Sequence, residues 1–293
     1  MARLTKISPR VLRGWPLPVP KNGDKESRGR VFIVAGAPEM PGAAILAATA
    51  ALRAGAGKLK VGVPRSVSMH VATAIPESLT IGYDESGSGA IGLGAARDIA
   101  ARANEGDALV IGPGMSDPDA CTQLIEAMIP LLNVPMVMDA TALTALHDRP
   151  RLLERLRGRV VLTPHPGEMA TMLSRSRDHI ERNPERWVGE AAHRYRAVVA
   201  LKGSRTLIAA PKERTYVNES GTVGLATSGS GDTLSGVIGG LLARGAEPLQ
   251  AAAWGVYVHA CAGEVLQRKM GMGFLARELL AEIPPVLQRL GAA

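Results

Sequence analysis

Apolar residues in this chain gather in short, unbroken runs, and between these runs apolar and polar positions recur at helical spacing. A short apolar run bounded by glycine, proline or polar residues is typical of a buried strand. The runs that predict strands are Val31–Gly36, Leu59–Val63, Ala108–Ile111, Met136–Met138, Val160–Leu162 and Val198–Leu201. Helical stretches lie between most of them, including Ala43–Ala54 and Asp117–Leu132. Strands that alternate with helices predict a mainly parallel sheet covered on both faces.

Two parts of the chain depart from this alternation. Thr206–Ala209 and Thr215–Asn218, joined by a turn over residues 210–214, predict an antiparallel hairpin at an edge of the sheet. Residues 232–267 then predict two apolar helices that are separated near Gly245 and Pro248. Residues 1–30 are polar and basic, and no repeat or linker composition divides the chain. We therefore expect residues 1–293 to form one domain, a three-layer α/β/α sandwich.

Polar or glycine-rich residues follow four of the predicted strands. These strand ends are Ile111–Gly114, Asp139–Ala140, Thr163–Glu168 and Lys202–Thr206. Each has a simpler explanation when it is taken alone, because Gly-Pro-Gly forms turns, a histidine between prolines suits a loop, and a lysine can be solvated. Ligands of open α/β sheets bind where the strands end, so the four ends together predict a binding crevice.

A glycine-rich turn at residues 226–231 leads directly into a predicted helix over Thr233–Leu242. Gly229 and Gly231 can adopt backbone angles that let successive N–H groups converge on an anion. The N-terminus of the helix adds unpaired donors and the positive end of the helix dipole. The segment therefore predicts a phosphate site, with Gly229, Ser230 and Gly231 as its cradle.

Asp232 is unusual in this position because a carboxylate repels a bound phosphate unless it takes up a proton or meets a cation. It suits a general base for a hydroxyl that attacks phosphorus. The alternative is that Asp232 only caps the helix, as aspartate often does. The segment alone leaves both roles open.

Composition narrows the classes of function. The 293 residues are 46% hydrophobic, which is ample for a core, and they contain two cysteines, Cys121 and Cys261, too few for a disulfide framework. There is no membrane-like apolar span and no signal-peptide pattern, so we expect a cytoplasmic protein with no membrane partner. The formal net charge is +7, but basic residues are scattered and only 3% of residues are aromatic. This disfavours nucleic acid and favours anionic small molecules.

The motifs together resemble a known family, the ribokinase-like ADP- or ATP-dependent NAD(P)H-hydrate dehydratases. The segments that carry the resemblance are MPGAAILAATAALRAGAGK, IGPG, MDATAL, TPHPGE, LKGSRT and ATSGSGDTLSG, in that order from about Gly36 to Glu264. One departure is that the glycine turn has Ser-Gly-Ser-Gly-Asp where many relatives have Gly-Gly-Thr-Gly-Asp. Ser228 and Ser230 keep the side chains small, so the backbone cradle should persist.

The resemblance implies a ribokinase-like fold and a repair reaction. Members of the family use a nucleotide to drive water out of hydrated NADH or NADPH (NADHX or NADPHX), through a phosphorylated intermediate. Bacterial members typically use ADP and release AMP and phosphate, with Mg2+ bridging phosphate oxygens. ATP stays open as the co-substrate. The resemblance also implies a homo-oligomer and, because about 30 residues precede the first strand, an NAD(P)HX epimerase on a separate chain.

The resemblance assigns residues to the two ligands. Carried over by position, it places the hydrated cofactor near Ala43, Gly114, His165 and Asp232. It places the nucleotide near Lys202, Gly203, Ser204, Arg205, Thr206 and Gly231, with Gly229 and Ser230 in the same phosphate turn. Asp232 is the expected base, and Asp139 and Glu168 are candidates to orient magnesium, although Glu168 also suits the start of a helix.

Two other functions compete with the repair reaction. A kinase of the same superfamily, acting on a hydroxymethylpyrimidine or hydroxyethylthiazole vitamin precursor, would share the phosphate turn and the base. The TPHPGE and KGSRT segments fit the dehydratases better. A non-catalytic nucleotide sensor is disfavoured by Asp232, because a protein that only binds gains nothing from a carboxylate beside a polyphosphate.

Overall fold

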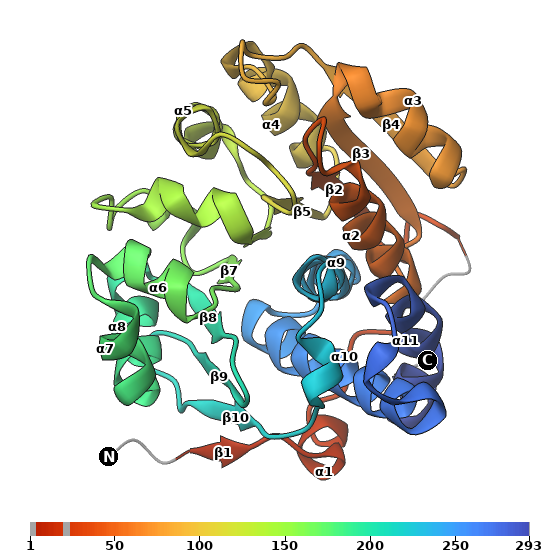
Figure 1. Cartoon of the computed structure of the whole chain (residues 1–293), viewed down its shortest axis with the longest axis vertical. Helices are drawn as coiled ribbons and strands as arrows, with labels where there is room; N and C mark the ends of the chain where they lie inside the picture. Colours follow the sequence, from red (N-terminus) through yellow and green to blue (C-terminus); the bar gives the residue numbers. More distant parts are fainter. Residues whose placement is uncertain (1–3, 20–23, 293) are drawn as a thin grey trace.

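The computed structural model describes residues 4–19 and 24–292, and its centre is a mixed sheet with helices on both faces (Figure 1). The described strands pair in the order β1-β10-β9-β8-β7-β6-β5-β2-β3-β4. They are β1 (Thr5–Lys6), β2 (Arg30–Val34), β3 (Lys58–Pro64), β4 (Ser78–Tyr83), β5 (Ala108–Ile111), β6 (Met136–Met138), β7 (Val160–Leu162), β8 (Val198–Leu201), β9 (Thr206–Ala209) and β10 (Tyr216–Asn218).

Strands β2 to β8 are parallel to one another, and the antiparallel pairs are β8 with β9 and β9 with β10. The predicted hairpin is thus confirmed, in the register Asn218 opposite Thr206. Beyond it lies β1, a two-residue strand in the polar N-terminal segment that pairs in parallel with β10. The last pairing on this side of the sheet is therefore made by residues from the start of the chain.

The helices cover the two faces of the sheet. They are α1 (Pro9–Arg13), α2 (Pro41–Arg53), α3 (Arg65–Ala74), α4 (Ala96–Asn104), α5 (Pro118–Met128), α6 (Pro166–Leu173), α7 (Arg177–Arg182), α8 (Pro184–Tyr195), α9 (Ser230–Ala243), α10 (Pro248–Met270) and α11 (Ala276–Arg289). Helices α2, α9, α10 and α11 pack together on one face, and α4 to α8 lie on the other (Figure 1). None of the described helices has the length and apolarity that crossing a bilayer would need.

Alternate residues of each central strand enter different cores, which explains why these strands appear as continuous apolar runs. Val31 and Ile33 of β2 belong to the core beneath α2 and α9. Phe32 and Val34, which point the other way, belong to the core beneath α4 and α5. A strand buried on both faces has no position that tolerates a polar side chain, so its sequence loses the usual alternation.

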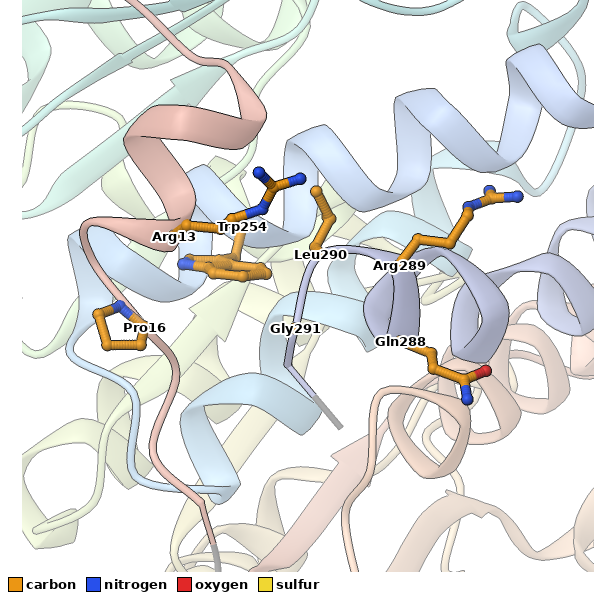
Figure 2. A pocket seen from close by; sticks show the side chains of 7 residues that line it. All are labelled: Arg13, Pro16, Trp254, Gln288, Arg289, Leu290 and Gly291. Carbon is orange, nitrogen blue, oxygen red and sulfur yellow. The ribbon is translucent and has the colours of Figure 1, made fainter.

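Residues 13–16 and the end of α11 lie beside α10. The indole N–H of Trp254 donates to the carbonyl of Trp15, and the Gln250 amide donates to the carbonyls of Trp15 and Pro16. Figure 2 shows a hollow of about 420 Å3 here, where Trp254 lies near Pro16 and the end of α11 at Leu290. These contacts attach Trp15 and Pro16 to α10.

Helices α2 and α9 approach so closely that side chains are excluded from the contact. A methyl group at Gly236 of α9 would collide with the backbone carbonyl of Ala47 in α2. A methyl group at Gly189 in α8 would meet no atom within 4 Å. The same substitution should therefore have opposite effects at the two positions.

We expect Gly236→Ala to lower the free energy of unfolding by about 1–3 kcal/mol or more, because the helices must separate. Gly189→Ala should raise it by about 0.5–1 kcal/mol, since alanine favours the helix. Chemical denaturation of both variants checks this. Equal effects of the two substitutions would show that helix propensity, rather than the contact between α2 and α9, decides the outcome.

Candidate active site

The four strand ends that the sequence singles out lie along one edge of the sheet. They follow β5, β6, β7 and β8, which are neighbouring parallel strands, so their carboxyl ends meet at the same side. A cavity of about 880 Å3 lies at this edge, and the N-terminus of α9 opens into it. It shares no lining residue with the hollow of Figure 2. Three of the four predicted strand ends, those after β6, β7 and β8, line this cavity, whereas Ile111–Gly114 after β5 does not.

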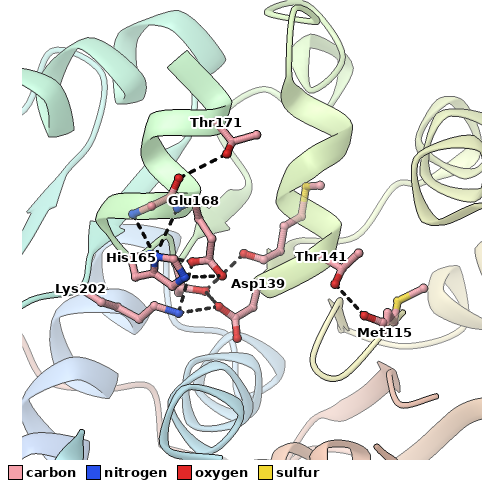
Figure 3. A network of polar contacts seen from close by, with 10 residues as sticks. Met115, Asp139, Thr141, His165, Glu168, Thr171 and Lys202 are labelled. Carbon is pink, nitrogen blue, oxygen red and sulfur yellow. Dashed lines mark hydrogen bonds and ion pairs between the residues drawn. The ribbon is translucent and has the colours of Figure 1, made fainter. Parts of the chain in front are cut away.

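A buried carboxylate and a lysine stand at the bottom of the cavity (Figure 3). Asp139, directly after β6, has a side chain only 2% exposed, and its Oδ1 accepts hydrogen bonds from Lys202 Nζ at 2.9 Å and Thr163 Oγ1 at 2.7 Å. Lys202 Nζ also lies 3.8 Å from Glu168 Oε2. Burial lowers the pKa of Lys202, but the carboxylates of Asp139 and Glu168 outweigh it, and the net pKa is raised. The ammonium group therefore stays charged.

His165 and Glu168 form a capping box at the start of α6 (Figure 3). His165 Nδ1 accepts from the amides of Gly167 and Glu168, and the Glu168 carboxylate accepts from the amide of His165 at 2.7 Å. These bonds fix the imidazole, and its Nε2 lies 3.5 Å from Glu168 Oε1. The His165 side chain is 56% exposed and lines the cavity.

The turn before α9 leaves backbone donors free. Gly229 has a φ of 86°, in the region that favours glycine, and it is the N-cap of α9. The amide of Ser230 bonds to Thr227 and that of Thr233 bonds to Gly229, whereas those of Gly231 and Asp232 have no acceptor among the described residues. A methyl group at Gly231 would lie 3.5 Å from Lys202 Nζ. Two free amides and an ammonium thus face one small space, which suits an anion.

Asp232 lies in the first turn of α9 and lines the cavity. Burial and, to a smaller extent, the Asp139 carboxylate raise its pKa to about 6, although the Lys202 charge partly opposes them. A carboxyl group with this pKa is mostly ionised at neutral pH yet basic enough to accept a proton from a hydroxyl.

The structure also contains a polar pair that the sequence prediction did not assign. Ser230 Oγ lies 3.1 Å from Nε2 of His259, which projects from α10, and both side chains are buried in the cavity wall. The only sequence signal was a histidine inside an otherwise apolar helix. Its partner lies 29 residues away, so spacing alone could not identify it.

Most of the predicted site residues line the cavity. They are His165, Lys202, Gly203, Ser204, Thr206, Gly229, Ser230, Gly231 and Asp232, together with Asp139. Arg205 is outside its lining and pairs with Glu185 at 3.0 Å. Ala43 and Gly114 also lie outside it, although they are neighbours, since a methyl group at Gly114 would collide with Ala43 Cβ. Their placement beside a ligand stays a prediction.

Neither cysteine belongs to the site. Cys121 is buried in the core, where burial raises its thiol pKa to about 12, and Cys261 on α10 is also unpaired. The described residues contain no cluster of three or more histidine, cysteine, aspartate or glutamate side chains that could hold a metal ion by themselves.

A family model and a sequence relative of this chain are both described as NAD(P)H-hydrate dehydratases. The profile of a family described as NAD(P)H-hydrate dehydratase matches residues 31–285. The chain is 44% identical over 289 residues to an ADP-dependent (S)-NAD(P)H-hydrate dehydratase of Xanthomonas campestris, with 98% of each chain covered.

Solved structures agree in fold. A crystal structure of the ADP/ATP-dependent NAD(P)H-hydrate dehydratase of Bacillus subtilis, co-crystallized with ATP/Mg2+, is similar with a TM-score of 0.80 and 29% identity, covering 97% of both chains. A ribokinase-like superfamily protein of Enterococcus faecalis has a TM-score of 0.81 at 22% identity, covering 98% of this chain and 96% of its own. The fold is thus ribokinase-like.

The raised pKa of Asp232 predicts that Asp232→Asn increases the free energy of unfolding, and that the increase depends on pH. Because the pKa in the folded state exceeds the ordinary aspartate value of 3.8, this group favours folding below about pH 4, and that stabilisation is lost as the pH rises through about 6. Above pH 6 the variant should be more stable than the parent by about 1–3 kcal/mol.

Denaturant unfolding between pH 4 and pH 8 measures this difference. Asp119→Asn is the matched control, because Asp119 is also in the first turn of a helix, α5, but is exposed. A stability difference that does not change between pH 4 and pH 7 would contradict the raised pKa of Asp232.

Proposed function

The chain belongs to the NAD(P)H-hydrate dehydratase family, and on this premise we propose that the cavity at the carboxyl edge of the sheet is its active site, with Asp232 as the base. Its activity is the ADP-dependent dehydration of (S)-NAD(P)H hydrate to NAD(P)H, which makes it a hydro-lyase. Because the family match extends over residues 31–285, this activity replaces the vitamin-precursor kinase as the function of the chain. The observation that supports the site is Asp232 itself, a carboxyl group of raised pKa beside two free helix amides.

The proposed chemistry has two stages. Asp232 accepts the proton of the hydroxyl on the hydrated ring, and the hydroxyl oxygen attacks the terminal phosphorus of ADP. The bond from that phosphorus to the bridging oxygen breaks, AMP leaves, and the ring carries a phosphate ester. The carbon–oxygen bond then breaks with help from the lone pair of the ring nitrogen, so that phosphate leaves. Loss of a proton from the adjacent ring carbon restores the dihydronicotinamide.

The remaining groups would hold negative charge during the transfer. The free amides of Gly231 and Asp232 and the positive end of α9 face the position of the transferred phosphoryl group. Lys202, kept charged by Asp139, supplies a cation close to Gly231. Preorganised donors of this kind lower a barrier by several kcal/mol, because they are already oriented when charge develops.

The nucleotide and the hydrated cofactor would occupy different walls of the site. Lys202, Gly203, Ser204 and Thr206, together with the turn before α9, are proposed to bind the nucleotide. His165, held by its capping box, is proposed to bind the hydrated cofactor through its exposed imidazole. Ala43, in the first turn of α2, and Gly114, in the loop after β5, are neighbours, and the proposal extends the contacts of the hydrated cofactor to them.

Magnesium fits the donor set as an ion that the nucleotide brings. Its preferred ligands are oxygen atoms, and it usually keeps several waters. Asp139 Oδ2 would lie 3.9 Å from a methyl group at Gly231, so a second carboxylate stands close to Asp232. Asp139 and Glu168, which both lie near Lys202, are proposed to orient an ion that is held mainly by phosphate oxygens and water. When bound, magnesium would neutralise charge on the phosphate being transferred.

The cellular setting belongs to the same proposal. We infer a cytoplasmic enzyme that acts on NADHX and NADPHX, with a separate epimerase supplying the S epimer. A homo-oligomer is also part of the proposal. The substrates are soluble nucleotides, and the unpaired thiols of Cys121 and Cys261 suit a reducing compartment.

The first test gives the purified protein NADHX with Mg2+ and either ADP or ATP, and follows the return of dihydronicotinamide absorbance. Faster recovery with ADP and stoichiometric release of AMP and phosphate are expected. Asp232→Asn should lower turnover at least 100-fold while ADP binding, measured by calorimetry, is kept. Near-normal turnover in this variant would refute Asp232 as the base.

The pH dependence of the wild-type rate gives a second test. Asp232 must be ionised to accept a proton, and its pKa is raised to about 6 by burial. We expect kcat/KM for NADHX to be flat above about pH 7 and to fall close to tenfold per pH unit below pH 6. A fall in kcat/KM that begins only near pH 4 would show that Asp232 is not the titrating group. Circular dichroism at pH 5 controls for unfolding.

A further inference from the structure

The buried contact between His259 and Ser230 joins the middle of α10 to the first residue of α9. His259 is 8% exposed and Ser230 is 6% exposed, so little solvent can satisfy either side chain. Both residues line the cavity, on the wall formed by the turn before α9. The pair is therefore placed where the phosphates of ADP are proposed to bind.

A serine hydroxyl has one hydrogen atom, and its direction decides how Ser230 meets an anion. If the hydroxyl donates to Nε2, only oxygen lone pairs remain for the ligand, and they repel a phosphate. If Nε2 carries a proton and donates to Oγ, the hydroxyl hydrogen is free to point at the phosphate. The position of the histidine proton thus controls whether Ser230 attracts or repels the ligand.

We propose that His259, as the tautomer protonated at Nε2, is a positioning residue that donates to Ser230 Oγ and thereby directs the Ser230 hydroxyl to a phosphate of the bound nucleotide. The proposal rests on the assignment of this cavity to ADP. It would add a third donor to the free amides of Gly231 and Asp232.

The surroundings keep the imidazole in the neutral form that this role needs. Burial and the nearby Lys202 charge lower the pKa of His259 to about 4, although a hydrogen bond with the Ser230 backbone partly opposes them. A charged imidazole would donate from both nitrogens and compete with Lys202 for the phosphate. A neutral imidazole instead acts only through the serine.

Calorimetric titration of MgADP into the variants tests the pair without requiring turnover. We expect Ser230→Ala and His259→Ala each to weaken ADP binding about tenfold, which is the usual value of a hydrogen bond to a charged group. The double variant should bind no more weakly than either single variant, because both changes remove one donor. His259→Gln should restore most of the affinity, since its amide can donate to Oγ.

Val258→Ala is the matched control, because Val258 precedes His259 on α10 and is buried in the core, outside the lining of the cavity. It should bind ADP as the parent does. Losses in the two single variants that add in the double variant, or a His259→Gln variant as weak as His259→Ala, would overturn the proposal. So would a His259→Ala variant with unchanged affinity.

Kinetics separate this inference from the proposed function. Where NADHX is dehydrated, His259→Ala should raise KM for ADP much more than it lowers kcat. A parent protein that binds ADP but never repairs NADHX would refute the function while leaving the binding experiment valid. A kcat loss as large as that of Asp232→Asn would instead refute a purely positioning role.

Discussion

The direct backbone contact between α9 and α2 determines where the site can form. Gly236 has no room for a side chain beside Ala47, and Gly239 in the next turn of α9 has none beside Val110 of β5. Helix α9 is consequently buried along nearly its whole length at the centre of the molecule (Figure 1). Because the helix cannot shift without separating α2 from the sheet, its N-terminus is fixed relative to the ends of β6 and β8. The free amides, Asp139 and Lys202 therefore meet through packing that lies outside the cavity.

Three charged side chains, Lys202, Asp139 and Asp232, lie around the N-terminus of α9. Lys202 stabilises one buried carboxylate, Asp139, by a direct hydrogen bond, whereas Asp232 has no such partner and keeps a raised pKa. Two carboxylates that differ in this way can serve different purposes, one as a fixed counter-charge and one as a proton acceptor. The Thr163 hydroxyl also donates to Asp139, so the counter-charge is held from two strands. Asp139 therefore neutralises Lys202, while Asp232 is left to accept a proton.

The sequence predicts the central strands closely, because buried runs between turn residues leave little choice of boundary. Strands β5, β6, β7 and β8 have the bounds that the apolar runs indicate, and residues after β6, β7 and β8 line the cavity. Strand β4 was missed, since Ser78–Tyr83 is only partly buried and carries polar residues. Helix α11 was missed as well, because it continues through Pro284 and Pro285, residues that usually end a helix. The Ser230–His259 contact joins two helices, which no local pattern encodes.

The pairing of β1 with β10 sets an order for folding during synthesis. Thr5 leaves the ribosome about 210 residues before its partner, Tyr216. Until then, the first residues of the chain have no edge on which to pair, and contacts over such separations form slowly. The carbonyls of Trp15 and Pro16 acquire their partners later still, because the donors, Trp254 and Gln250, lie on α10. The beginning of this protein is therefore among the last parts to reach its native structure, and a nascent chain would remain open to proteases at its N-terminus until synthesis is nearly complete.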